Sequence, residues 1–109
     1  MPYIAPHDRR SLDPLIDRLA EQIVEQAKTY THDAAFAGLL NYACTRLALK
    51  VIRLRFGALR YWIIAITTGV FKNIADEFYR RLGALYEQKQ IAQNGDVDLY
   101  AEFEEKLKS

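Results

Sequence analysis

The fold is decided by residues 59–91, LRYWIIAITTGVFKNIADEFYRRLGALYEQKQI. Apolar residues recur here every three or four positions, which is the spacing that lines one face of an α-helix. These residues are Ile63, Ile66, Val70, Ile74, Phe78, Leu82 and Leu85. We therefore expect one long helix, from about Leu59 to about Lys89, whose apolar face forms the core.

Two further helices are predicted before this stretch. The first begins near Asp13 and Pro14, because Asp can cap a helix and Pro suits its first turn, and it ends around residues 29–31. Residues 1–12 are then an extended segment. The second helix follows Asp33, another good cap, and runs to about Phe56, where Gly57 suits a left-handed end.

A short fourth helix is predicted at the carboxyl end. Residues 94–96, Asn-Gly-Asp, form a turn signal, and apolar residues then recur at helical spacing through Leu99, Tyr100, Phe103 and Leu107. This helix, over residues 98–109, is acidic, and we expect it to dock on the basic middle of the chain or on a partner chain. The predicted fold is all-α: a compact bundle of three main helices plus this short one, in a single domain over residues 1–109.

The apolar content points to self-association. Half of the 109 residues are hydrophobic, which is generous for so short a chain. The second predicted helix also carries a second apolar side, formed by Leu49, Ile52 and Phe56. A helix that is apolar on two sides needs two neighbours. We therefore expect a homo-oligomer that buries this side between subunits.

Charge is unevenly distributed along the chain. The net charge is only +1, so the total gives no reason to expect nucleic acid as a partner. Residues 34–72, however, contain six basic residues and no acidic residue, and the flanking segments carry an excess of acidic ones. This basic block suits an anionic ligand, or alternatively the packing of the acidic ends against the middle.

The sequence carries no complete catalytic or metal-binding signature. It has no phosphate-binding glycine loop, no nucleophile elbow and no cysteine–histidine pair. His7 and His32 have no further ligands at metal spacing, and Cys44, the single cysteine, lies within an apolar helix where we expect it to be buried. We therefore predict no catalytic residues, no metal and no cofactor.

No membrane segment is expected. The amino terminus lacks the apolar centre of a signal peptide, and the most apolar run, residues 61–71, has eleven residues, whereas about 20 are needed to span a bilayer. We expect a cytoplasmic protein.

A set of polar and aromatic residues on two predicted helices suggests a ligand site. Arginine forks hold phosphate, Asn and Thr donate and accept hydrogen bonds, and tyrosine rings stack on bases. The candidate ligand-binding residues are Asn41, Tyr42, Thr45 and Arg46 on the second helix and Glu77, Tyr79, Arg80 and Arg81 on the third. The alternative is structural: Asn41, Thr45 and Glu77 bond one another at a helix crossing, and the arginines are solvated.

Several motifs resemble those of a known family. They are the opening MPYIAPHDRRSLDPLIDRLAEQI, LLNYACTRL over residues 39–47, and GVFKNIADEFYRRLGALYEQKQIAQNGDV over residues 69–97. In order and spacing they are similar to a family of small, functionally uncharacterised proteins of bacteria and their phages. The family pattern ends soon after NGDV, whereas this chain continues to Ser109. The resemblance implies a helical fold and a bacterial or phage setting, but no catalytic residues.

The leading hypothesis is a non-enzymatic, homo-oligomeric binding protein that holds a small anionic, nucleotide-like ligand. In a phage setting, such a protein would suit the sequestration of a host signalling nucleotide. Two alternatives remain open. One is a protein–protein interaction module without a small ligand, and the other is a nucleotide-processing enzyme whose site is assembled across subunits.

Overall fold

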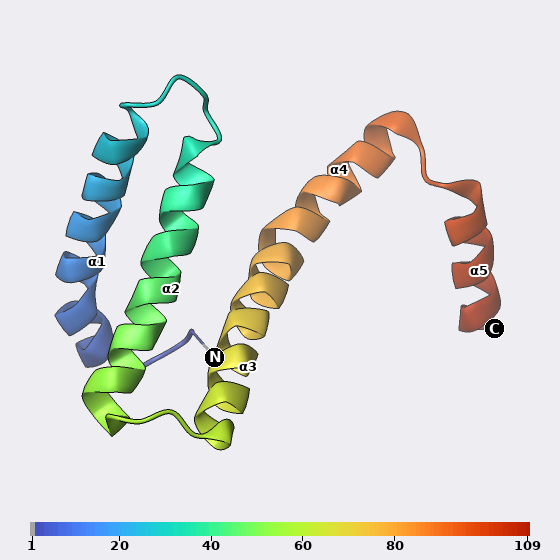
Figure 1. Cartoon of the computed structure of the whole chain (residues 1–109). Helices are drawn as coiled ribbons and strands as arrows, with labels where there is room; N and C mark the ends of the chain where they lie inside the picture. Colours follow the sequence, from blue (N-terminus) through green and yellow to red (C-terminus); the bar gives the residue numbers. More distant parts are fainter. Residues whose placement is uncertain (1) are drawn as a thin grey trace. The chain divides into compact units, whose positions relative to one another are not determined.

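The computed structural model describes residues 2–109, and this part of the chain is all-helical without strands, which confirms the predicted class (Figure 1). The elements are α1 (Pro6–Ala27), α2 (Ala35–Phe56), α3 (Tyr61–Phe78), the π-helical segment η1 (Tyr79–Gly83), α4 (Ala84–Asn94) and α5 (Asp98–Lys108). They fall into two compact units, Met1–Gly69 and Val70–Ser109, which divide within α3.

Helix α1 begins earlier than predicted. Pro6 occupies its first turn after the extended Ala5, whose carbonyl accepts hydrogen bonds from the N–H groups of Asp8 (3.0 Å) and Arg9 (3.2 Å). The extended segment therefore ends at Ala5 rather than at residue 12, and Pro14 lies inside the helix instead of starting it. Pro6 and Pro14 both suit the first turn of a helix. Because no residue between them breaks the helix, the helix begins at the earlier one, Pro6.

Helix α2 ends where the sequence predicts. Gly57 follows Phe56 with φ of 75°, and its N–H donates to the Arg53 carbonyl at 3.0 Å. This left-handed conformation favours glycine, which has no Cβ to clash. The predicted cap at Asp33 is wrong. The cap position belongs to Ala34, and the backbone N–H of Ala35 bonds the His32 carbonyl (3.3 Å) at this end.

The single long helix predicted over residues 59–89 is divided by η1 into α3 and α4, and it continues to Asn94. Gly83 makes this π-helical segment compatible with the Tyr79 ring: a Cβ added to Gly83 would lie 2.7 Å from Tyr79 Cδ2. Gly95, with φ of 88°, ends α4, and residues 95–97 link it to α5.

The predicted core face is largely exposed. Figure 1 shows α1 and α2 side by side, and the side chains of Ile23, Leu39 and Ala43 in this pair are half-buried. Within residues 2–109, the one buried residue is Ile63, at 3% exposure. The other six residues of the predicted face are exposed, and so is Cys44, which corrects two expectations. Helical periodicity shows that a face is apolar, but it does not show what covers that face.

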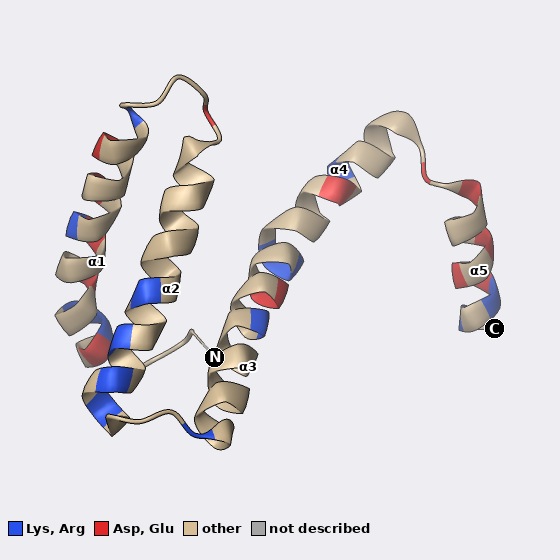
Figure 2. Cartoon of the chain, viewed as in Figure 1, with Lys and Arg blue, Asp and Glu red and all other residues tan. Residues whose placement is uncertain are grey.

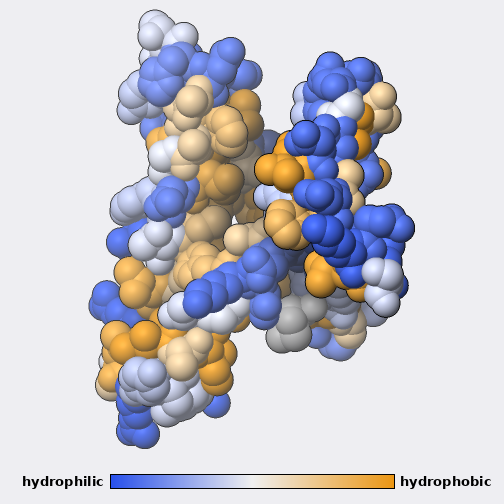
Figure 3. All heavy atoms as spheres, turned by 90° about the vertical axis from the view of Figure 1, so that its right-hand side faces the viewer, coloured by the Kyte–Doolittle hydropathy of each residue, from blue (hydrophilic) through white to orange (hydrophobic). Residues whose placement is uncertain are grey.

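Large apolar side chains are exposed in both units. Examples are Leu15 and Leu47 in residues 1–69, and Phe78 and Leu85 in residues 70–109. Hydrophobic side chains lie openly among polar ones on the surface in Figure 3. Water-exposed apolar area of this extent calls for a further covering contact.

Candidate functional site

A row of cations on α2 forms the candidate site. Arg46, Lys50 and Arg53 are spaced by four and three residues, so they share one side of the helix. Figure 2 shows the basic residues of α2 gathered in its carboxyl-terminal half. A surface pocket of about 210 Å³ is lined by the three cations together with Tyr42, Thr45 and Leu49.

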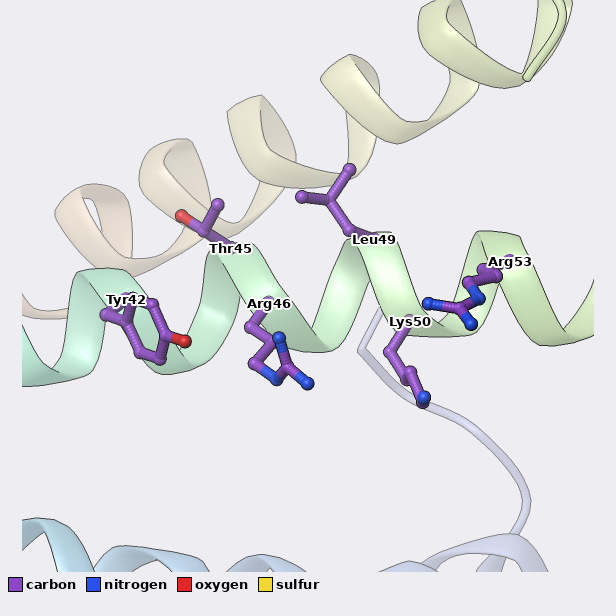
Figure 4. Close-up of a pocket in the computed structure, with 6 residues that line it drawn as sticks. All are labelled: Tyr42, Thr45, Arg46, Leu49, Lys50 and Arg53. Carbon is purple, nitrogen blue, oxygen red and sulfur yellow. The ribbon is translucent and has the colours of Figure 1, made fainter. Parts of the chain in front are cut away.

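Figure 4 shows how these side chains lie along α2. Arg46 and Lys50 extend from one side of the helix, and Thr45 and Leu49 from another. The Tyr42 ring lies one helical turn before Arg46. The pocket therefore presents an aromatic face at one end and a row of positive charge along its length.

The three cations have no acidic partner in the part of the chain that the structure describes. None of them makes an ion pair there, and α2 contains no acidic residue. The guanidinium carbon of Arg55, two residues after Arg53, lies 4.9 Å from the centre of the Phe56 ring. Like charges three and four residues apart on a helix repel one another, and an anion bound between them relieves that repulsion.

The two smaller predicted residues on α2 bond each other. The Thr45 hydroxyl donates to the Asn41 backbone carbonyl at 2.8 Å, and it lies 3.4 Å from the Asn41 side-chain oxygen. This back-bond occupies the hydroxyl proton, so Thr45 can offer a ligand only acceptor lone pairs.

Beside the cation row lies a larger apolar groove between α1 and α2. Its volume is about 530 Å³, and its apolar lining includes Leu19 and Ile23 of α1 and Leu39, Ala43 and Leu47 of α2. Tyr42, Arg46 and Lys50 line this groove as well as the smaller pocket. The site thus combines apolar surface with positive charge, as many small-molecule sites do.

The other predicted site residues form a local network. Glu77 pairs with Arg80, and with Arg81 at 3.9 Å, and its side chain is 22% exposed. The Tyr79 hydroxyl donates to the Glu87 carboxylate. This hydrogen bond, and secondly the negative charge of Glu87, raise the pKa of Tyr79 above its ordinary value.

The structure thus places the predicted residues in two groups. Tyr42, Thr45 and Arg46 line one pocket on α2, with Asn41 bonded to Thr45. Glu77, Tyr79, Arg80 and Arg81 are engaged within α3, η1 and α4. Sequence reasoning did not include Lys50 and Arg53 in the site, although their spacing from Arg46 places all three on one side of the helix.

Two further properties bear on the class of protein. Residues 2–109 hold no group of three or more His, Cys, Asp or Glu side chains that could bind a metal ion.

Helix α2 is long and apolar enough to cross a membrane by length and composition. Length and apolar composition alone do not separate a membrane-spanning helix from the core helix of a soluble protein.

The fold and the site together define a small all-α protein with a cationic pocket on its second helix. The chain belongs to the family described as Domain of unknown function (DUF6899), whose model matches residues 1–97. No curated protein and no solved structure matches the chain. Helix α5 begins at Asp98 and so lies directly after the matched range.

Proposed function

We propose that this protein is a non-enzymatic, homo-oligomeric binding protein that holds a small anionic, nucleotide-like ligand on the cation row of α2. The observation that carries the proposal is the row itself: Arg46, Lys50 and Arg53 line one pocket and make no ion pair within residues 2–109. Because α2 supplies no carboxylate of its own, an incoming anion is the natural counter-charge.

The pocket chemistry favours a phosphorylated ligand with an aromatic group. Arg46 and Arg53 each present a planar fork that can bond two phosphate oxygens, and Lys50 between them supplies a point charge. The Tyr42 ring at the end of the row can stack on a base, a contact worth on the order of 1–3 kcal/mol in single-strand binding. In a bacterial or phage cytoplasm, such a site suits the sequestration of a signalling nucleotide.

Arg80 and Arg81 belong to the proposed ligand set on weaker grounds. Glu77 already pairs with both of them, so a phosphate would have to compete with that carboxylate. Within residues 2–109, Arg46, Lys50 and Arg53 pair with no carboxylate. We therefore expect Arg46 to contribute more to binding than either arginine of η1.

Assembly is the second part of the proposal. Both units expose large apolar side chains, among them Leu15 and Leu47 in residues 1–69 and Phe78 and Leu85 in residues 70–109, and an assembly of several copies would cover such side chains. We propose that copies of the chain complete a compact helical bundle by covering one another's apolar faces. Wild-type protein at micromolar concentration should therefore sediment as an oligomer, and a monomer would overturn this part.

Ligand binding is tested by calorimetry and thermal shift with cyclic and linear nucleotides, with inorganic phosphate and pyrophosphate as matched anions without a base. Arg46→Ala should abolish binding while leaving the melting temperature within a few degrees, and Arg80→Ala in η1 should weaken binding less. Binding of pyrophosphate as tight as that of any nucleotide would show that Tyr42 contributes no stacking. If no anion binds, the ligand proposal fails.

A protein–protein interaction module is the second candidate function. It is favoured by the apolar side chains that α3 and α5 expose. If wild-type protein binds no anion and yet sediments as a monomer with these faces uncovered, a different protein becomes the expected partner.

A further inference from the structure

Two glutamines of α1 line the apolar groove between α1 and α2. Gln22 and Gln26 are four residues apart, so they share one side of α1. The Gln22 side-chain nitrogen donates to the Gln26 side-chain oxygen at 3.2 Å. This bond holds the two amides together, and it leaves the Gln22 oxygen as an acceptor and the Gln26 nitrogen as a donor for a further group.

The amide pair lies at the same end of the groove as the Tyr42 ring. Helices α1 and α2 run side by side in opposite directions (Figure 1), so the carboxyl end of α1 is level with the amino-terminal part of α2. Gln26 stands directly before the last residue of α1, and Tyr42 lies in the first half of α2. Lys50 follows Tyr42 by eight residues, or about 12 Å of helical rise. The groove therefore has an aromatic and amide end and a cationic end.

A purely apolar occupant does not suit the amide end. A hydrocarbon side chain placed there would take the Gln22 oxygen and the Gln26 nitrogen out of water without replacing their hydrogen bonds, which costs free energy. A nucleobase has apolar faces for the ring and the groove, and a polar edge for the amides. The groove volume of about 530 Å³ is typical of small-molecule sites.

We propose that Gln22 and Gln26 bind the edge of the ligand's base and that this base is adenine. Its ring stacks on Tyr42, its amino group donates to the Gln22 oxygen, and a ring nitrogen beside that amino group accepts from the Gln26 nitrogen. Glutamine recognises adenine through the same two groups in DNA. The inference rests on the proposed function, since the phosphates of the same nucleotide stay on the cation row of α2.

Guanine fits the amide end less well than adenine does. Its pairing edge presents a ring N–H and an amino group, two donors side by side, which a carboxylate accepts with both of its oxygens. Among the described residues that line the groove, none carries a carboxylate. The amide pair offers one acceptor and one donor in the structure, and adenine offers the complementary donor and acceptor.

The proposal is tested by calorimetry of the full chain with ADP, GDP and pyrophosphate. Wild type should bind ADP at least about 5-fold more tightly than GDP. Gln22→Met and Gln26→Met keep an unbranched side chain without the amide, and each should weaken ADP binding about 5-fold while pyrophosphate binding stays unchanged. Val24→Met is the matched control, because Val24 is exposed on α1 and does not line the groove, and it should bind ADP as wild type does.

Gln26→Glu gives a second readout that a merely structural role would not move. The new carboxylate accepts from the two donors of guanine, so the ratio of the GDP to the ADP dissociation constant should fall about 10-fold. Both ligands carry the same phosphates, so repulsion between the new charge and the phosphates cancels in this ratio. Circular dichroism checks that the helices are intact, and an unchanged ratio in the folded variant overturns the proposal.

The outcomes separate this inference from the proposed function. If wild type binds ADP and the two methionine variants bind it equally well, or if GDP binds as tightly as ADP, the inference fails and the cation-row site stands. Equal weakening of ADP and pyrophosphate by the methionine variants also overturns it, because the glutamines then act on the cation row and not on the base. If wild type binds neither nucleotides nor pyrophosphate, the proposed function fails, and this inference fails with it.

Discussion

The cations of α2 and the arginines of η1 are alike in chemistry and differ in their partners. Arg46, Lys50 and Arg53 line a pocket without an ion pair in the described chain, whereas Arg80 and Arg81 both pair with Glu77. Charge that is balanced within its own helix stabilises that helix by a small amount. Positive charges without a nearby carboxylate repel one another and so lower the stability slightly, and they can bind an anionic ligand or partner. Substitutions in the two regions should therefore have opposite effects.

The largest effect is expected at Gly83. In Gly83→Ala the new Cβ would lie 2.7 Å from Tyr79 Cδ2, so the ring or the π-helical backbone must move. Crowding of this kind costs about 1–3 kcal/mol, and thermal unfolding at fixed protein concentration measures it.

Gly69→Ala is the matched control for Gly83→Ala. A Cβ at Gly69, also within a helix, would meet no atom within 4 Å. It should stabilise α3 by up to about 1 kcal/mol through helix propensity. Loss of assembly in this variant, with the helices intact, would instead show that Gly69 lies at a subunit contact.

Glu77→Gln should have the next largest effect. It removes the carboxylate that pairs with both Arg80 and Arg81, while keeping the size of the side chain. The arginine side chains are 70% and 63% exposed, so solvent screening limits the loss to about 1 kcal/mol, or roughly 4–8 °C in melting temperature. An unchanged melting temperature would mean that the network of η1 contributes no stability.

Lys50→Gln should act in the opposite direction. It removes the central charge of an unpaired row, and each like-charge pair on a helix costs about 0.2–0.5 kcal/mol. The variant should therefore melt slightly higher than wild type and bind anions more weakly, and a thermal-shift titration measures both. A lower melting temperature would reveal a stabilising partner for Lys50 and weaken the contrast between the two regions.

The smallest effect is on the pH dependence of stability. The pKa of Tyr79 is raised because its hydroxyl donates to the Glu87 carboxylate. The stability from this hydrogen bond is therefore fully present below about pH 10, the unfolded pKa of tyrosine, and is lost as the pH rises through the higher folded value. In an ultraviolet titration, Tyr79→Phe should remove the tyrosine that ionises late, and titration of all tyrosines together in wild type would contradict this.

The sequence predicted the helical class and the end of α2, because periodicity and Gly57 act locally. It did not predict η1, because the π-helical segment coincides with a contact between Tyr79 and Gly83 that periodicity does not encode. It also could not show that Leu82 and Leu85 would be exposed, since their burial depends on a partner. Asn41, Tyr42, Thr45 and Arg46 were found through their residue types, whereas Lys50 and Arg53 required attention to their spacing.

The π-helical segment also changes the phase of the helix that contains it. A π turn closes its hydrogen bonds five residues apart instead of four, so it holds one more residue, and side chains beyond it are rotated by roughly 100°. The stripe formed by Ile74 and Phe78 therefore runs out of register with Leu82 and Leu85. One straight partner helix therefore cannot contact both pairs of side chains at the same time. A neighbour that packs against Ile74 and Phe78 therefore loses contact at η1. Leu82 and Leu85 face a different direction, where a different neighbour can pack.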